Sequence, residues 1–209
     1  MGPQPSDNMA FWNRFARFYD RFMARLSPDY PTLIERLDRD MGDARRILDV
    51  ATGTGLIALG LANADREVHG VDLSREMLSQ AAAKATDMAT ALQFRVGSVY
   101  ELPYRDGSFD AVVCANALHM VSEPERVLDE INRVLVPGGR AFLPTYCHAQ
   151  TWRSRALSRL MCLSGFRVYT RFSEEMLRRM VTSAGFTVIA SDLSDDTMPL
   201  CYLSAMRQI

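Results

Sequence analysis

The chain has 209 residues, of which 48% are apolar, and its 24 basic and 25 acidic side chains leave a formal net charge of −1. This length fits one domain with a substantial core and is too short for two. The balanced charge argues against bulk attraction to nucleic acid. No apolar run is long enough to span a membrane, and residues 1–7 lack the features of a signal peptide. We therefore expect one globular domain in the cytoplasm.

Apolar and aromatic residues recur at helical spacing between Phe11 and Leu26, with Arg14, Arg17 and Arg21 between them. This pattern predicts an amphipathic helix that ends at Ser27-Pro28. The helix either packs its aromatic stripe over the domain or forms a lid whose basic face meets an anionic substrate or a membrane surface. With a second helix over 30–40, residues 1–45 are predicted to form an N-terminal helical lid.

A buried strand over residues 46–50 is followed by a turn of small residues and by a helix from Leu56. Two glycines in that turn, Gly53 and Gly55, permit positive φ and close approach of a ligand to the backbone. Asp49 ends the strand, which places its carboxylate at the edge where open α/β sheets bind ligands. The helix that follows offers unpaired N–H groups.

A second strand, residues 67–72, ends in Asp72, 17 residues after Gly55. A carboxylate in that position can accept hydrogen bonds from both hydroxyls of a ribose. The two strands together indicate a cofactor that contains adenosine. Both NAD and S-adenosylmethionine (SAM) satisfy the pattern up to this point.

Two further segments distinguish these cofactors. Residues 108–119 read as a strand and its exit loop, and Pro137-Gly138-Gly139 precedes a strand that runs through Tyr146. Taken in order from residue 47 to residue 143, this set resembles the class I SAM-dependent methyltransferases. Within them it is most similar to the small-molecule branch that includes quinone and phospholipid methyltransferases.

Five strands that alternate with helices predict a doubly wound parallel sheet. Residues 186–190 and 200–206 resemble the family's final antiparallel pair. We therefore expect a Rossmann-like sheet of seven strands, mostly parallel with an antiparallel last strand, and helices on both faces. Residues 46–209 would form this SAM-binding core. Within it, the arginine-rich residues 148–172 are predicted to be an insertion on the substrate side.

The resemblance implies a set of cofactor-binding residues: Asp49, Ala51, Thr52, Gly53, Gly55, Asp72, Leu73, Ser98, Val99 and Asn116. Those from Asp49 to Gly53 would hold the methionine part of SAM, and Asp72 would bind the ribose. Leu73, Ser98 and Val99 would surround the adenine, and Asn116 would line the junction with the substrate. Relatives usually carry glycine where Ala51 stands, so we expect Ala51 to keep a negative φ.

His119 and His148 are the candidates for a conventional catalytic base, and a structural role for His119 is the alternative. By the resemblance, Tyr19 would reach the cofactor or the substrate and could assist catalysis. Tyr146 and His148 leave a strand at the same edge and are candidate substrate contacts. The cysteine and histidine spacing predicts no metal site.

These features predict a cytoplasmic enzyme that transfers a methyl group from SAM to a small molecule. The arginine-rich segments favour an anionic or lipid-like acceptor such as a phospholipid headgroup, with peripheral membrane contact through the N-terminal helix. A quinone or aromatic natural product is the alternative acceptor. An NAD-dependent oxidoreductase and a non-catalytic cofactor-binding protein are the alternatives from other classes.

Overall fold

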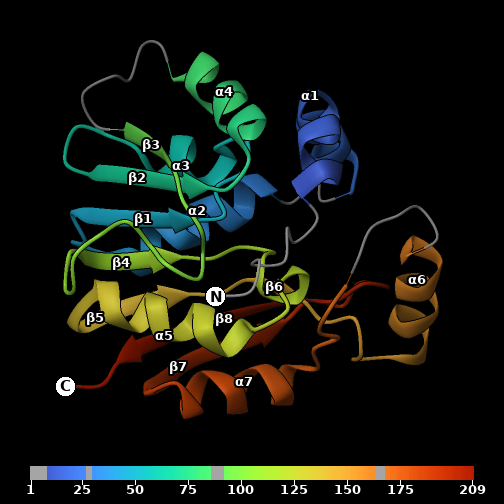
Figure 1. Ribbon diagram of the computed structural model, residues 1–209. Helices are drawn as coiled ribbons and strands as arrows, with labels where there is room; N and C mark the ends of the chain where they lie inside the picture. The colour runs from blue at the N-terminus through green and yellow to red at the C-terminus, as the bar shows by residue number, and fades with distance from the viewer. Residues whose placement is uncertain (1–8, 27–29, 86–91, 163–167) are drawn as a thin grey trace, which may run out of the picture.

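The centre of the fold is a mixed sheet of eight strands, seen in a computed structural model that describes residues 9–26, 30–85, 92–162 and 168–209 (Figure 1). Its neighbours run in the order β3-β2-β1-β4-β5-β8, and β1 to β5 are parallel. The strands are β1 (Arg46–Val50), β2 (Glu67–Asp72), β3 (Leu92–Val96), β4 (Phe109–Val113), β5 (Leu135–Phe142), β6 (Thr145–Tyr146), β7 (Phe186–Leu193) and β8 (Leu200–Arg207).

The prediction of a mostly parallel, doubly wound sheet is confirmed, but the strand count differs by one. The expected fifth strand is divided into β5 and β6, which lie one after the other along the same edge of β8. Pro144 stands between them and has no N–H for the ladder. Its carbonyl instead accepts the backbone N–H of Asn116 at 2.8 Å. Strand β7 pairs antiparallel with the other edge of β8.

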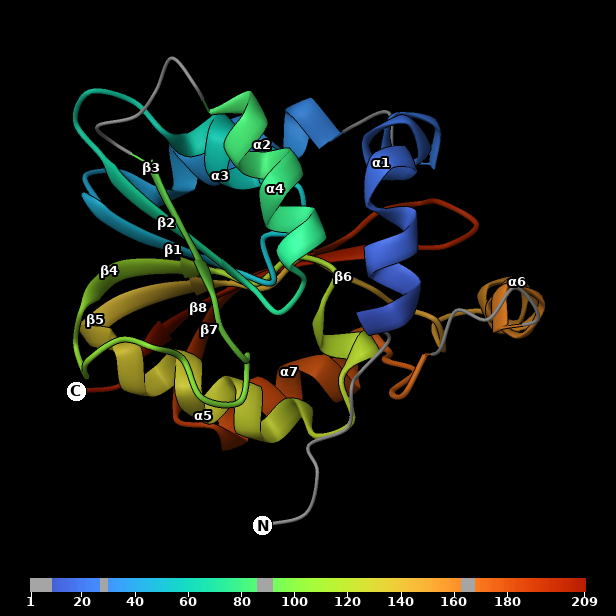
Figure 2. The ribbon, with the colours of Figure 1, turned by 45° about the horizontal axis from the view of Figure 1, so that its top comes forward.

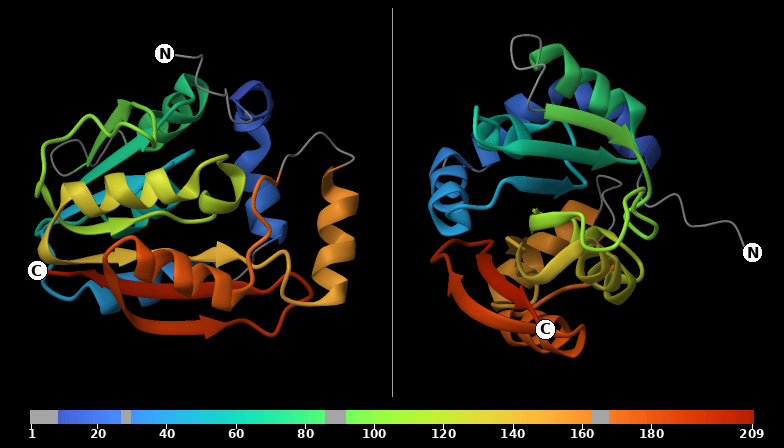
Figure 3. Two further views of the ribbon diagram at one scale, coloured as in Figure 1. Left: turned by 60° about the horizontal axis from the view of Figure 1, so that its bottom comes forward. Right: turned by 90° about the vertical axis from the view of Figure 1, so that its left-hand side faces the viewer.

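Helices cover both faces of the sheet, as Figures 2 and 3 show. The helices are α1 (Met9–Leu26), α2 (Tyr30–Met41), α3 (Leu56–Leu61), α4 (Arg75–Lys84), α5 (Pro124–Val134), α6 (Trp152–Cys162) and α7 (Glu174–Ser183), with a 3₁₀ turn at Leu118–Met120. Two clusters of buried side chains pack four of these helices against the sheet. One packs α2 and α3 on one face of the sheet, and the other packs α5 and α7 on the opposite face.

Alternation along β1 explains how one strand serves both clusters. Ile47 joins the α2–α3 cluster, while Leu48 and Val50 join the α5–α7 cluster. The strand order reverses between β1 and β4, and ligands bind at such a point, outside the carboxyl ends of the strands. The topology therefore directs attention to the loops that follow β1, β2 and β4.

Serine caps fix the starts of two helices. Ser74 accepts the N–H of Met77 at 3.1 Å, and Ser173 accepts that of Met176 at 3.3 Å. The predicted helix from Ser74 to about Asp87 is described as far as Lys84. The expected stop at Ser27-Pro28 and the region 86–91 lie outside the described residues. Among the helices that the structure describes, none is both long enough and apolar enough to cross a bilayer.

Candidate cofactor and acceptor site

The turn after β1 is held by its own backbone. Thr52 donates its N–H to the carbonyl of Val71 at 3.0 Å, and Gly55 donates to the carbonyl of Thr52 at 2.9 Å. Gly55 has φ 77° and leads into α3. Ala51 has φ 57°, so the expectation of a negative φ there is wrong. The bond from Thr52 to the neighbouring strand helps to hold this left-handed conformation in spite of its cost for a residue with a Cβ.

Asp49 lies beneath this turn. Its side chain is 2% exposed and accepts a hydrogen bond from Thr52 Oγ1 at 2.6 Å. Burial raises the pKa of Asp49 to about 7, although the bonds from Thr52 and from the N–H of Ala58 favour the charged form. The carboxylate thus stabilises the turn through Thr52 and the start of α3 through Ala58. Its role toward the cofactor stays a prediction.

Asp72, at the end of β2, faces the same turn from the side. Its Oδ2 accepts the N–H of Gly53 at 2.8 Å, and its Oδ1 accepts the N–H of Ser74 at 2.8 Å. Burial raises the pKa of Asp72, and these backbone bonds oppose the shift. The backbone N–H of Leu73 also opposes it. A carboxylate has about four acceptor sites, so at least one is still free to receive a hydroxyl. Asp72 is therefore oriented by the backbone and still able to bind a ligand.

A cavity of about 340 Å³ opens beside Asp72, in the size range of small-molecule sites. Eight of its lining residues belong to the predicted site: Tyr19, Ala51, Gly53, Asp72, Leu73, Ser98, Val99 and Asn116. Eight others were not predicted as site residues: Trp12, Ser74, Met77, Tyr100, Ala115, Ala117, Met120 and Val121. Helical periodicity placed Trp12 on the stripe of the first helix, but it did not show which part of that stripe meets the cavity.

Part of the cavity wall is apolar. Leu73 is 41% exposed and lines the cavity, as does Met77 from α4. Ser98 and Val99 line the same cavity from the loop after β3, and Ser98 Oγ accepts the N–H of Tyr100 at 3.2 Å. An adenine in this position would cover Leu73. The fit of the cavity to a nucleoside depends on the exposed Leu73 and on the remaining acceptor capacity of Asp72.

Asn116 also lines the cavity. It is 8% exposed, has φ 54°, and follows β4 by three residues. Its side-chain oxygen and nitrogen both lack a hydrogen bond of normal geometry within the described part of the chain, although the hydroxyl of Tyr30 comes close. Buried amides are normally paired, and strained backbone clusters at functional sites. The side chain is therefore positioned to bind a ligand.

Three tyrosines from separate elements lie near one another. Tyr19 comes from α1, Tyr30 from the start of α2 and Tyr146 from β6. Burial raises the pKa of both Tyr19 and Tyr30, and nearby Asp49 adds to the effect. Tyr146 also raises the pKa of both Tyr19 and Tyr30, and Tyr19 raises that of Tyr30. The hydroxyls therefore stay protonated. Tyr30 was missed in the sequence, because the first residue of a short surface helix carries no sign that it reaches a site.

The two candidate bases lie together, next to the cavity rather than in its lining. The rings of His119 and His148 are 4.8 Å apart, and Tyr146 lies 6.4 Å from His119. His119 is 3% exposed and His148 is 1% exposed. Burial lowers the pKa of His119 to about 3, with a further contribution from His148, and lowers the pKa of His148 to about 4, with a further contribution from Arg171. Both imidazoles are therefore neutral near pH 7.

Helix α1 is fastened over the cavity by one carboxylate. Asp20 accepts a hydrogen bond from Thr54 Oγ1 at 2.5 Å and pairs with Lys84 Nζ at 2.8 Å. Thr54 belongs to the turn after β1, and Lys84 is the last residue of α4. These contacts hold Trp12 and Tyr19 against the site. The described part of α1 thus closes one side of the cavity, as a lid would.

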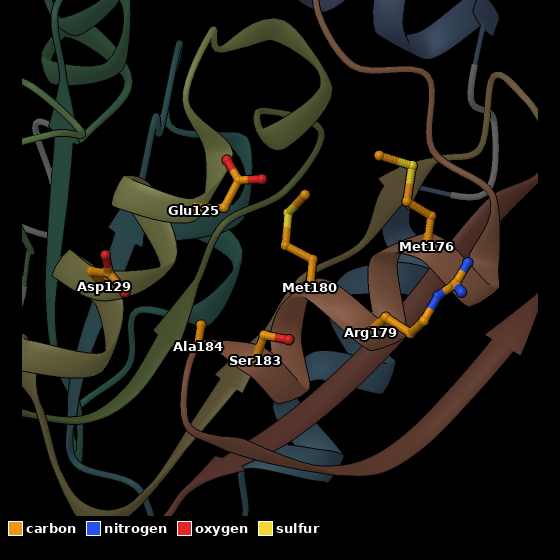
Figure 4. Close-up of a pocket in the computed structure, with 7 residues that line it drawn as sticks. All are labelled: Glu125, Asp129, Met176, Arg179, Met180, Ser183 and Ala184. Carbon is orange, nitrogen blue, oxygen red and sulfur yellow. The ribbon is translucent and has the colours of Figure 1, made fainter.

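A second cavity, of about 370 Å³, lies between α5 and α7 and is drawn in Figure 4. It is lined by Glu125, Asp129, Met176, Arg179, Met180, Ser183 and Ala184. None of these residues lines the first cavity. No His, Cys or Tyr is among them, so the chemistry of this chain is better sought beside Asp72. Among the described residues, no group of three or more His, Cys, Asp or Glu side chains is arranged to hold a metal ion.

Comparisons with known proteins agree with this geometry. Residues 48–143 match the family model described as a methyltransferase domain. A demethylmenaquinone methyltransferase of Deinococcus radiodurans is 43% identical over 101 residues, which are 47% of this chain and 42% of that protein. The chain thus spans less than half the length of this relative.

Solved structures match almost the whole chain. A SAM-dependent methyltransferase of Thermotoga maritima has a TM-score of 0.78 at 19% identity, covering 96% of this chain and 99% of that one. The magnesium protoporphyrin IX methyltransferase of Synechocystis PCC 6803 was solved with bound S-adenosylhomocysteine (SAH). It has a TM-score of 0.69 at 21% identity, and the match covers 87% of this chain and 83% of that one. At such identities the likeness shows the fold. The two findings agree: residues 48–143 are similar to a methyltransferase domain, and the fold resembles that of SAM-dependent methyltransferases.

Proposed function

We propose that this protein transfers a methyl group from SAM to a small, uncharged acceptor that carries a hydroxyl or a similar nucleophile. The observation that carries the proposal is the position of Asp72, whose carboxylate is fixed by Gly53 and Ser74 beside an open cavity. The ribose hydroxyls would bind Asp72, the adenine would lie on Leu73 near Ser98 and Val99, and the methionine part would lie along the turn above Asp49.

SAM brings an activated methyl group, so the protein has to align the acceptor, exclude water and receive a proton where one is released. Helix α1 would exclude water through Trp12 and Tyr19. Asn116 and the hydroxyls of Tyr30 and Tyr146 would hold the acceptor by hydrogen bonds. Because His119 and His148 are neutral, their ring nitrogens can accept a hydrogen bond from an acceptor hydroxyl, but their lowered pKa values make them weak proton acceptors.

The cavity favours a flat, neutral acceptor over an anionic headgroup. Among the described residues, no lysine or arginine lines it, while Trp12, Met77, Met120 and Val121 supply apolar walls. A quinol or other aromatic acceptor fits these walls, and one relative is named a demethylmenaquinone methyltransferase. Six of the arginines that suggested a phospholipid headgroup are exposed to the outside on α1 and α6 instead: Arg14, Arg17, Arg21, Arg153, Arg155 and Arg159. An acceptor with an apolar tail would also be lipid-like, and contact of the N-terminal helix with a membrane belongs to this version of the proposal.

Two measurements test the proposal in sequence. Isothermal titration should show binding of SAM and of SAH, and absence of binding below about millimolar would overturn the cofactor part. The protein, SAM and a panel of quinols, catechols and phospholipids would then be analysed by mass spectrometry for the gain of one methyl group. We expect methylation of a quinol or catechol. Methylation of only the phospholipids would overturn the assignment of a neutral aromatic acceptor, and cofactor binding without any product from these or from a metabolite extract would favour the non-catalytic alternative.

A further inference from the structure

The outer face of α1 carries arginine and one large aromatic side chain. Arg14, Arg17, Phe18 and Arg21 are spaced by three, four and seven residues, so they share one side of the helix. All four are exposed, and Phe18 is 60% exposed. The stripe that faces the domain is separate from this one and contains Trp12 and Tyr19. Phe18 is therefore exposed without a packing role inside the described domain.

Helix α6 repeats this arrangement. Trp152, Arg155 and Arg159 are spaced by three and seven residues and are exposed, with Trp152 73% exposed. The guanidinium of Arg153 lies 5.5 Å from the centre of the Trp152 ring. Ser154 and Ser158, four residues apart on another side of α6, are buried. The two helices thus present the same combination of side chains to the outside.

The positive charge of both outer faces is not neutralised by nearby acidic side chains of the described chain. Residues 148–172 contain no acid, and the acid on α1, Asp20, is already bound to Thr54 and Lys84. Within the described residues, the structure records no ion pair for the exposed arginines of either helix: Arg14, Arg17, Arg21, Arg153, Arg155 and Arg159. Because the whole chain has a net charge of −1, this positive charge is local.

The two helices stand on the same side of the molecule, beyond the carboxyl ends of the parallel strands (Figures 1 and 3). The inner face of α1 lines the cavity through Tyr19. On α6, the Ser158 hydroxyl accepts a hydrogen bond from Arg171 at 3.2 Å. The charge of Arg171 in turn helps to lower the pKa of His148. The helices therefore flank the acceptor side of the site.

We propose that the outer faces of α1 and α6 together dock the protein on the surface of an anionic lipid bilayer, with Phe18 and Trp152 inserted among the headgroups. Arginine beside aromatic side chains is the composition of helices that lie in a membrane interface. Each cation near an anionic surface adds to binding, and six of them make the charge match substantial. The inference deepens the proposed function, on which it rests for the acceptor, because the bilayer would deliver a dissolved acceptor to the cavity that Tyr19 of α1 lines.

The test uses the full chain and sedimentation with phosphatidylcholine vesicles that contain or lack phosphatidylglycerol. We expect the wild type to bind only the anionic vesicles and to be released as salt rises. The double variant Arg17→Glu/Arg159→Glu should bind at least about tenfold more weakly. Phe18→Ser/Trp152→Ser should bind more weakly at high salt, where the contribution of the aromatic residues dominates.

The matched control, Arg45→Glu/Arg105→Glu, reverses the charge of two exposed arginines that precede β1 and β4, at the amino ends of the parallel strands. It should bind vesicles as the wild type does. SAH titration on every variant separates the two proposals, since none of these residues lines the cavity. Wild-type protein that binds SAH but no anionic vesicle would overturn the docking surface and leave the methyl transfer intact. Equal weakening in the control pair, or salt-sensitive binding to a duplex oligonucleotide in place of vesicles, would overturn it as well.

Discussion

Gly53 donates its backbone N–H to Oδ2 of Asp72 at 2.8 Å, and this bond joins the turn after β1 to the end of β2. Gly53 and Asp72, 19 residues apart in sequence and both predicted to bind the cofactor, are thereby held in one orientation. The carboxylate is oriented before any ligand arrives, which reduces the ordering that binding must impose. The same bond means that changes at Asp72 affect both the ligand and the turn.

Asp72→Asn should weaken SAH binding about 10- to 100-fold, because the ribose hydroxyls lose a charged acceptor whose bonds contribute about 1.5–3 kcal/mol. Isothermal titration measures the loss. Asp65→Asn, in the exposed turn before β2, is the matched control and should bind like the wild type. Equal affinities for the wild type and Asp72→Asn would remove Asp72 from the site.

Gly55→Ala should lower the free energy of unfolding by about 2–5 kcal/mol, which is the sum of a left-handed backbone and an overpacked contact. An added Cβ would lie 3.0 Å from Ala81 Cβ and 3.0 Å from Phe94 Cζ. Gly138→Ala is the control, because Gly138 has φ 76° and nothing within 4 Å of an added Cβ. Urea unfolding of both variants separates the two costs. An equal loss in both would show that packing at Gly55 contributes nothing.

Lys84→Met should speed the release of bound SAH about two- to fivefold, since it breaks the exposed pair with Asp20 that helps to hold α1 over the cavity. Thr54→Val should have a larger effect, because Thr54 is fully buried and its hydroxyl binds the same carboxylate. Stopped-flow fluorescence of Trp12 would follow the release. Arg126→Met breaks a comparable surface pair with Glu123 and serves as the control. Unchanged release in both α1 variants would show that this contact does not hold the lid.

Asp49→Asn should flatten the dependence of stability on pH in the absence of cofactor. Burial raises the pKa of Asp49 to about 7 from 3.8, so the folded state binds the proton more tightly than the unfolded chain. Stability from this group is complete below pH 4 and is lost as the pH rises through 7, by up to about 4 kcal/mol. Urea unfolding from pH 4 to pH 8 should show a smaller fall in the variant. Parallel curves for the two proteins would contradict the raised pKa.

His119→Gln should act in the opposite pH range. Burial lowers the pKa of His119 to about 3, so the fold favours neutral imidazole. The corresponding stability is present above pH 6.5 and is lost as the pH falls toward 3. We expect the acid unfolding midpoint of the variant to move to lower pH, as followed by circular dichroism. A midpoint at the same pH would show that protonation of His119 does not drive acid unfolding.

The sequence was sufficient for features that depend on near neighbours in the chain. Apolar runs predicted the strands, and serine predicted the helix starts at Ser74 and Ser173. The acid at the end of β2 was placed correctly beside the turn, because parallel strands bring their carboxyl ends to one edge. The turn itself was expected from its glycines. The family resemblance then supplied the cofactor, which these local patterns left open between NAD and SAM.

The tertiary structure alone decided features that depend on contacts between distant segments. The positive φ of Ala51 depends on how the turn meets β2, and the position of Tyr30 near Asn116 depends on how α2 packs. The division of β5 from β6 at Pro144 depends on a common partner, β8. Sequence periodicity placed arginines on helix faces, but only the fold placed them outside the cavity. Local patterns specify elements, whereas packing between elements decides which side chains share one site.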